Sequence, residues 1–401
     1  MTPLERSSAT EARCRPTAAQ ELLLRACLSD DDAALDAWER WRAAVDLDRI
    51  DEESLRLLPL TCFRLQGTAA RDRTLEIAKG VYRRAWYQNQ LLLRTLSGVL
   101  DVVAAGGIDA MLLKGVSLAT RYYPNVATRP MVDIDLLVPH RDAERAVALL
   151  GREGFCPIKH TPPRQLVDYA HGVSLVRGQS SIDLHWNALW PQRRADADRP
   201  FWESARRIEH EGRPAYVLAP TDELFHACMH GARLSQNAYS WAPFPLVRWI
   251  TDAFMIARRA EIDWQRIAAL AERFHARLHL RDAFLYLRDG LGFQVPDALL
   301  AEWAHARSPA DELHYELALA PRAPRFFAAL PRFRFWKSYR MKTYIEEQAT
   351  DAHETSLLHR LAGFPPYVVA FVKADLDVER LRDVPGKLAR KLASHPSLLR
   401  P

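Results

Sequence analysis

Two carboxylates, Asp133 and Asp135, alternate with apolar side chains about a third of the way along the chain. In an extended strand successive side chains point to opposite faces, so the two acids share one face. Val132, Ile134 and Leu136 then share the other face, where they would hold the strand in a core. Neighbouring like charges repel each other, and a divalent cation compensates that repulsion when no base lies between them. The spacing therefore predicts a metal site; the alternative is a half-exposed strand with solvated acids.

A turn made of phosphate-binding residue types precedes the acids. The apolar run 110–113 predicts a strand that ends in Lys114-Gly115-Val116-Ser117, and a helical pattern follows. Gly115 would let the backbone approach an anion, and the start of the helix offers free N–H groups. Lys114 and Ser117 would add a charge and a hydroxyl group. The Walker spacing is absent, so the turn predicts a phosphate cradle that is not a P-loop.

A predicted hairpin supplies a third carboxylate. The runs 173–176 and 180–186 have the composition of strands, and the turn 177–179 joins them. By the same alternation, Asp183 and His185 share one face of the second strand. Asp183 then completes a constellation of three acids, and His185 would orient it, bind a softer metal or cap the sheet face. The alternative is an ordinary hairpin whose polar face meets water.

Together these motifs resemble a known group of proteins. The order LLKG, YYP, Arg129, DIDLLV and IDLHW, followed by the helical segment LAPTDELFHACMH, is similar to the uncharacterised bacterial nucleotidyltransferase family of the DNA polymerase beta-like superfamily. The resemblance covers residues 75–260. The superfamily usually has Gly-Gly or Gly-Ser at the turn and a shorter gap to the acids, whereas here Lys114 precedes the glycine and the gap is longer. These departures match the uncharacterised branch better than the polymerases.

The resemblance implies an α+β fold with a polymerase beta-like core, in which helices back a mixed sheet. Amphipathic patterns predict helices over 17–66 and 74–105, the second of which packs on the sheet, and a crossover helix over 141–151. Helical patterns return after Pro220. The expected organisation is a disordered N-terminus over 1–16, a helical N-terminal region over 17–105, a catalytic core over 106–219, a helical C-terminal domain over 220–345 and a C-terminal extension over 346–401.

The implied activity is transfer of a nucleoside monophosphate from a nucleoside triphosphate, with release of pyrophosphate. The implied catalytic and metal-binding residues are Asp133, Asp135 and Asp183. They would hold two Mg2+ ions, with Mn2+ as an alternative, and Asp183 would take a proton from the acceptor. The implied nucleotide-binding residues are Lys114, Gly115, Ser117 and Arg129. For Arg129 the alternative is an exposed arginine at the start of a strand.

The acceptor is left open among three hypotheses. The first is a small molecule or a peptide, because relatives often accompany biosynthetic genes for modified peptides or saccharides. The second is RNA, as in related toxin-like enzymes. The third is a protein that binds ATP or another nucleotide without turnover, since its glycine motif is altered.

Composition limits the remaining classes of protein. With 401 residues and 48% hydrophobic residues, the chain can bury a large core. Lys and Arg number 55 against 50 for Asp and Glu, a balance that permits anionic ligands without requiring nucleic acid. Five cysteines without Cys-x-x-Cys spacing argue against disulfides and structural zinc, and favour the cytoplasm. We expect neither a signal peptide nor a membrane span.

Two later segments carry further candidate residues. His226 and His230 share a helix face and could bind zinc, but no third ligand is evident, so a packed or acceptor-facing pair is favoured. Asp252 lies among apolar residues and should accept a hydrogen bond, with one of these histidines as a candidate donor. Residues 321–342 contain seven Lys or Arg residues and no acid, interleaved with aromatics. This segment predicts RNA binding, or else an amphipathic element with solvated arginines.

Overall fold

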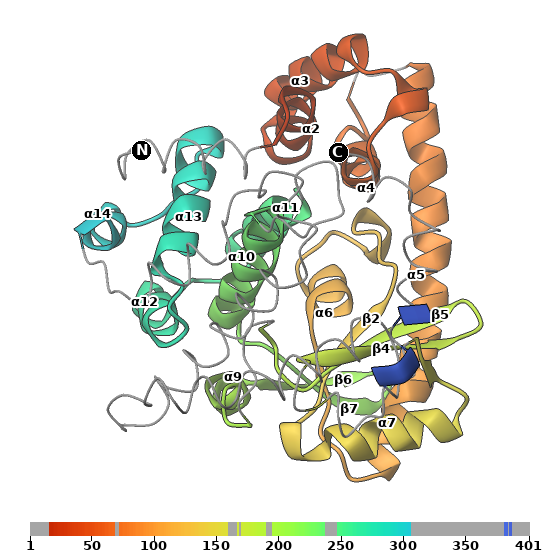
Figure 1. Ribbon diagram of the computed structural model, residues 1–401. Coiled ribbons are helices and arrows are strands. Elements are labelled where there is room, and N and C mark those ends of the chain that lie inside the picture. The colour runs from red at the N-terminus through yellow and green to blue at the C-terminus, as the bar shows by residue number, and fades with distance from the viewer. Residues whose placement is uncertain are drawn as a thin grey trace.

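The computed structural model describes residues 16–68, 72–158, 167, 170–189, 195–236, 247–305, 381–383 and 385–386 (Figure 1). Within these ranges helices and a mixed sheet combine, which confirms the predicted α+β class. The basic and aromatic segment 321–342 and the expected disordered N-terminus up to residue 15 lie outside the described residues. The domain boundaries inferred from the sequence stay predictions.

The sheet has seven strands in the order β3-β4-β5-β2-β1-β7-β6. The strands are β1 (Met111–Leu112), β2 (Ile134–Leu137), β3 (Cys156–Pro157), β4 (Gly172–Arg177), β5 (Ser180–His185), β6 (Arg206–His210) and β7 (Arg213–Val217). Strand β2 pairs parallel with β5, and β1 pairs parallel with β7; the other neighbours are antiparallel. The predicted hairpin is confirmed as β4 and β5.

The register of the two central strands brings two of the predicted acids together. Asp135 of β2 lies opposite Asp183 of β5, and residues that face each other in a parallel pair project to the same side of the sheet. On the other side Ile134 and Leu136 are fully buried, as predicted. Val132 was predicted to lie on this buried side as well, and that is wrong. Its side chain is 59% exposed, because β2 begins only at residue 134.

The helices follow the predicted patterns closely. Thr17 and Gln20 form a capping box at the start of α2, the first helix of the pattern predicted over 17–66. The long pattern over 74–105 is a single helix, α5, and the expected crossover helix is α7. No described helix is both long enough and apolar enough to cross a membrane. The helices are α2 (Ala18–Leu28), α3 (Asp31–Ala44), α4 (Glu52–Arg64), α5 (Arg73–Ala105), α6 (Lys114–Arg121), α7 (Ala143–Arg152), α9 (Arg199–Ser204), α10 (Pro220–Gln236), α11 (Arg248–Ala257), α12 (Trp264–Arg273), α13 (Arg277–Leu291) and α14 (Asp297–His305).

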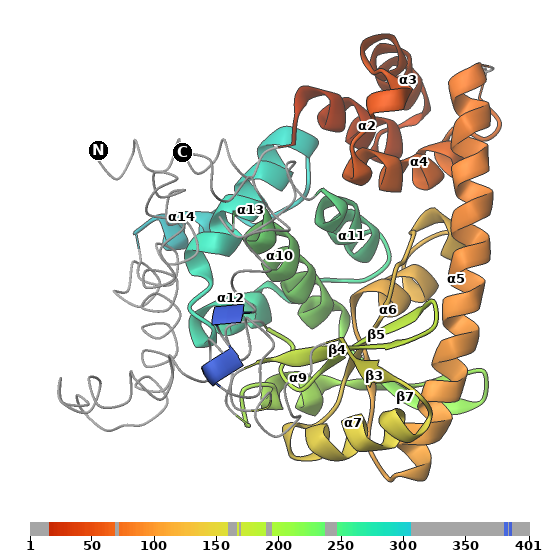
Figure 2. The ribbon, with the colours of Figure 1, turned by 45° about the vertical axis from the view of Figure 1, so that its right-hand side comes forward.

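Two apolar cores lie on opposite faces of the sheet. One core joins the sheet to α5 and α7, which run beside it in Figures 1 and 2. The other core contains residues of α2–α4 and of α10–α14, together with Leu137 and Leu118. The helices before and after the sheet in sequence therefore share one core. This core lies on the side of the sheet to which Asp135 projects.

Helix α5 also fixes the segment that leads into β2. Nδ2 of Asn89 donates to the carbonyl oxygens of Val126 and Arg129 at 2.5 and 2.9 Å, and its Oδ1 accepts from the N–H of Met131 at 3.0 Å. Asn89 is fully buried. One amide thus satisfies three backbone groups of the irregular segment that ends at Asp133.

We expect Asn89→Ala to lower the free energy of unfolding by roughly 3 kcal/mol, because it leaves three backbone groups without a partner. Urea denaturation of this variant and of Gln90→Ala, its exposed neighbour on the same helix, measures the effect. Equal stability of the two variants would contradict the assigned role of Asn89.

Candidate active site

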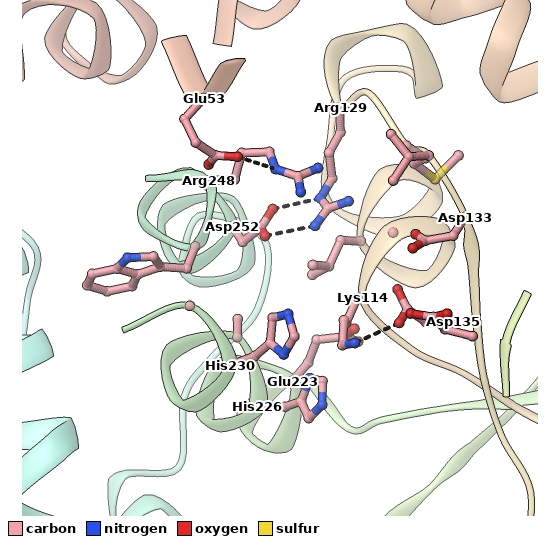
Figure 3. Close-up of a pocket in the computed structure, with 18 residues that line it drawn as sticks. Glu53, Lys114, Arg129, Asp133, Asp135, Glu223, His226, His230, Arg248 and Asp252 are labelled. Atoms are coloured by element: carbon pink, nitrogen blue, oxygen red, sulfur yellow. Dashed lines mark hydrogen bonds and ion pairs between the residues drawn. The ribbon is translucent and has the colours of Figure 1, made fainter. Parts of the chain in front are cut away.

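A pocket of about 190 Å³ lies between the sheet and the helices of the second core (Figure 3). Its walls come from α6, from β2 and β5, from the segment 129–133, and from α4, α10 and α11. The structure brings together in this pocket nearly all the residues implied by the sequence motifs: Lys114, Gly115, Arg129, Asp133, Asp135 and Asp183. Ser117 does not line the pocket.

The closest group of metal-ligating atoms joins the two central strands. One ligand atom each of Asp135, Asp183 and His185 lies within 4.8 Å of the others. Asp133 is outside this group but lines the same pocket, in the bend before β2. His185 belongs to this group, as its alternative role of metal ligand requires, but its side-chain partner is Asp135 rather than Asp183: its Nε2 lies 3.1 Å from Oδ1 of Asp135.

The acids of this cluster are electrostatically unequal. Burial, together with the charges of Asp135 and Asp183, raises the pKa of Asp133 to about 6. Burial also disfavours ionised Asp135, but Lys114 and His185 outweigh it and hold the pKa of Asp135 well below its usual range. The protein thus supplies the positive charge that compensates ionised Asp135. It supplies too little positive charge to compensate ionised Asp133.

The charge of Lys114 is the largest single contribution to this compensation. Its Nζ donates to Oδ1 of Asp135 at 2.6 Å, and the side chain of Lys114 is only 16% exposed. The backbone of Lys114 is left-handed, with φ of 43°, where the strand turns into α6. The N–H of Leu113 donates to the carbonyl oxygen of Asp135, which ties the turn to β2. The first residue of the predicted phosphate cradle is thereby linked to the acid cluster.

The donor set fits a hard divalent cation. Oδ1 of Asp183 accepts from Oγ of Ser174 at 2.5 Å, and Oδ1 of Asp135 is held by Lys114 and His185. No described residue donates a hydrogen bond to Oδ2 of either acid, or to Asp133. Free carboxylate oxygens that converge on one pocket are the ligands that Mg2+ prefers.

Ser117 lies behind the pocket wall. It is fully buried, and its Oγ donates to Oε2 of Glu223 at 3.0 Å. Arg121 also reaches Oε2 of Glu223, at 2.6 Å. Burial raises the pKa of Glu223 to about 7, although Arg121 and Ser117 oppose this effect. These contacts join α6 to α10, and direct binding of phosphate by Ser117 stays a prediction.

Arg129 occupies the wall of the pocket opposite the acids (Figure 3). It forms a bidentate ion pair with Asp252 of α11, with distances of 2.8 and 2.9 Å. Asp252 also accepts a hydrogen bond from the hydroxyl of Tyr123 at 2.7 Å. The expectation that a histidine donates to Asp252 is therefore wrong. Arg129 is a buried, paired side chain, and the alternative of an exposed arginine is wrong as well.

The two histidines of α10 line the pocket without forming a metal site. Their rings are stacked, with centroids 6.1 Å apart, and neither belongs to a metal-ligating group among the described residues. Nε2 of His226 lies 3.1 Å from the carbonyl oxygen of Ala188. Burial lowers the pKa of His226 to about 3, so this residue is neutral near pH 7. The structure places both histidines in the pocket wall, and their contact with an acceptor stays a prediction.

Sequence reasoning missed three charged residues of the pocket. Glu53 comes from α4, Glu223 from α10 and Arg248 from α11. Glu223 lies in the segment LAPTDELFHACMH but was given no role there, and no quoted motif contains Glu53 or Arg248. The three residues are far apart in sequence and meet only when both helical regions pack against the sheet. The only sequence signal that these residues belong to the pocket was that each is a charged residue in a predicted helical segment.

A mixed sheet that carries an acid cluster beside a Lys-Gly turn is the arrangement that the sequence motifs predicted for a nucleotidyltransferase, and comparison with known families agrees. The chain belongs to a family described as "Uncharacterised nucleotidyltransferase", whose sequence model matches residues 53–292. The predicted family membership is confirmed. Searches of curated proteins and of solved structures found no match. The matched segment contains every pocket residue described above.

The segment after β5, which supports His226, depends on a buried acid. Oδ2 of Asp198 accepts from the N–H of Ala188 at 2.8 Å, and no described residue donates to its Oδ1. Burial raises the pKa of Asp198 to about 7, only partly offset by the Ala188 hydrogen bond. The folded state therefore favours the protonated acid, whereas the unfolded state has a pKa of about 4.

We expect Asp198 to reduce stability as the pH rises from about 4 to about 7, because the unfolded state ionises over this range while burial keeps the acid protonated in the folded state. Asp198→Asn retains an acceptor oxygen without the charge. This substitution should raise the free energy of unfolding more at pH 8 than at pH 5. The gain is at most a few kcal/mol, because each unit of difference between the folded and unfolded pKa values corresponds to about 1.4 kcal/mol. Urea denaturation at both values measures this, and an equal effect at both would refute it.

Proposed function

We propose that the protein is a Mg2+-dependent nucleotidyltransferase with a polymerase beta-like core. Its reaction would transfer a nucleoside monophosphate from a nucleoside triphosphate to a hydroxyl or phosphate group and release pyrophosphate. The pairing of Asp135 with Asp183 on adjacent parallel strands carries the proposal, because it brings two acids that are distant in sequence to one metal-sized site. Membership of a nucleotidyltransferase family supports it.

The three acids divide the chemistry between them. When bound, Mg2+ would neutralise charge on the triphosphate and lower the pKa of the acceptor hydroxyl. Asp133 and Asp135 would supply oxygen ligands from the bend before β2 and from the start of β2. Asp183, from the neighbouring strand, would complete the second site and accept the proton of the acceptor hydroxyl.

The turn at the start of α6 would orient the phosphates. Helix α6 begins without a side-chain cap, so its first N–H groups remain available at the pocket wall. A Cβ atom on Gly115 would lie 3.3 Å from Sδ of Met131 and 3.7 Å from Nη1 of Arg129, so a larger residue would narrow the cradle. Lys114 is the first residue of this turn, and its Nζ donates to Asp135. Lys114 could exchange this carboxylate for a phosphate oxygen.

A small molecule or a peptide is the acceptor that the pocket supports best. The side of the pocket made by α10 and α11 presents His226, His230 and Trp249, a polar and aromatic wall beside the acid cluster. Walls of this kind hold small ligands in a fixed orientation. Family resemblance to proteins encoded with biosynthetic genes supports the same choice, and suggests a role in natural-product biosynthesis.

RNA is a second acceptor class, and one described feature favours it. The outer side of α5 carries Arg83, Arg84 and Arg94 beside Trp86 and Tyr87, all of them exposed. Cations interleaved with exposed aromatic rings can bind a phosphate backbone and stack bases. The basic segment 321–342, outside the described residues, has the same composition.

We expect Asp133→Asn to abolish Mg2+-dependent release of pyrophosphate while leaving the melting temperature unchanged or slightly raised. The substitution removes a charge that Asp135 and Asp183 repel, so it should not weaken the fold. Asp109→Asn, an exposed acid just before β1, is the matched control. A marked fall in melting temperature without metal would mean that Asp133 is structural.

The donor is tested separately, by calorimetry with ATP, GTP, CTP and UTP in the presence of Mg2+. We expect one of the four to bind to the wild type and to be lost in the Asp133→Ala, Asp135→Ala double variant. Binding without any release of pyrophosphate would favour the inactive nucleotide-binding protein. Failure of all four to bind would remove the proposal.

For the RNA acceptor, charge reversal of Arg332, Arg334 and Lys337 should abolish retention of RNA in a gel-shift assay. Loss of several phosphate contacts lowers affinity by orders of magnitude at moderate salt. Unchanged RNA binding in this triple variant would exclude the segment 321–342 as the RNA site.

A further inference from the structure

Two guanidinium groups face the acid cluster across the pocket. Arg129 comes from the segment before β2 and Arg248 from α11, and Figure 3 shows them side by side. Arg248 is close enough to Asp133 for its positive charge to favour the ionised carboxylate. The positive charge of Arg129, in turn, disfavours the charged form of Arg248. Two adjacent like charges at a partly buried site are unfavourable unless an anion lies between or beside them.

The partners of these arginines are unequal. Arg129 is neutralised by Asp252 through Nε and Nη2, and its Nη1 has no partner among the described residues. Arg248 donates from Nη1 to the carbonyl oxygen of Pro130 at 3.1 Å. Its nearest carboxylate, Oε1 of Glu53, is 4.0 Å from its Nε, too far for a hydrogen bond.

Two nitrogen atoms of Arg248 therefore lack hydrogen bonds to described residues. Nε is buried and has no partner, and Nη2 has none either. Glu53 cannot move closer at no cost, because it already accepts from Arg56 at 2.8 Å and from the N–H of Val247 at 3.1 Å. Arg248 is thus held in place by its neighbours but is incompletely neutralised by them.

We propose that Arg248 binds the polyphosphate tail of the donor, together with Nη1 of Arg129. The inference rests on the proposed function and assigns a residue that the sequence motifs did not contain. A guanidinium group with free N–H donors binds a phosphate oxygen more strongly and more directionally than a lysine does. The donor would then lie with its metal-bound side on the acids and its outer phosphates on the arginines.

This arrangement makes the helical regions part of the donor site. Glu53 of α4 accepts from Val247, the residue before Arg248, and so positions the start of α11. Asp252, one turn further on, holds Arg129. The phosphate-binding wall is therefore built by α4 and α11 together, and the sheet alone provides only the metal-binding wall.

The test is calorimetric binding of inorganic tripolyphosphate with Mg2+ to the wild type, Arg248→Gln and Arg248→Lys. We expect the dissociation constant to rise at least about tenfold in Arg248→Gln and by less in Arg248→Lys, which retains the charge. Arg259→Gln is the matched control, since Arg259 is exposed beyond the end of the same helix. It should bind as the wild type does.

A second readout separates phosphate binding from a general structural role. Mn2+ binding to the acid cluster, measured by electron paramagnetic resonance without phosphate, should be retained in Arg248→Gln, because the group of Asp135, Asp183 and His185 remains intact. Wild-type affinity for tripolyphosphate in both Arg248 variants would overturn the inference, and so would an equal loss of Mn2+ binding in Arg248→Gln. If that variant does not fold, Arg248→Lys decides the outcome. Absence of nucleotide and tripolyphosphate binding in the wild type would instead overturn the proposed function.

Discussion

The pairing of two acids across parallel strands is the constraint on which the site depends. Asp135 and Asp183 face each other in register, so their charges cannot separate without breaking the sheet. The protein compensates one of them with Lys114 and His185, and ties the other to Ser174. The remaining carboxylate oxygens stay open to the pocket. A rigid sheet thus keeps repelling groups together at a separation that suits a cation.

The helices make this site a pocket. Their apolar residues form one core, so the segments before and after the sheet in sequence hold each other in place. The ion pair of Arg129 with Asp252 joins the sheet side to the helical side. Breaking such a buried pair leaves an uncompensated charge, which is strongly destabilising. The two sides are therefore expected to keep a fixed relative position around the donor.

Local patterns were sufficient to predict the pocket wall that carries the acid cluster. Alternation placed Asp135 and Asp183 on one face of their strands, and the glycine turn predicted the start of α6. The opposite wall could not be predicted in the same way, since the partner of Asp252 is a residue 123 positions away. Alternation put His185 on the same face as Asp183, but its contact with Asp135 depends on the parallel pairing of β2 with β5, which alternation alone could not indicate. Such contacts between distant residues depend on how the elements pack together, and the local patterns of a single sequence do not reveal this packing.

The position of α5 has a consequence for how this protein can be divided. Its C-terminal half, from Leu92 to Val103, supplies one core of the sheet, and its N-terminal end packs with α4 in the other. One continuous helix therefore bridges both hydrophobic interiors. A fragment limited to residues 106–219 would expose the apolar face of its own sheet. The smallest unit that can fold on its own must include all of α5. The boundary of a fusion or truncation therefore has to lie before this helix, and not directly before the sequence motifs that follow it.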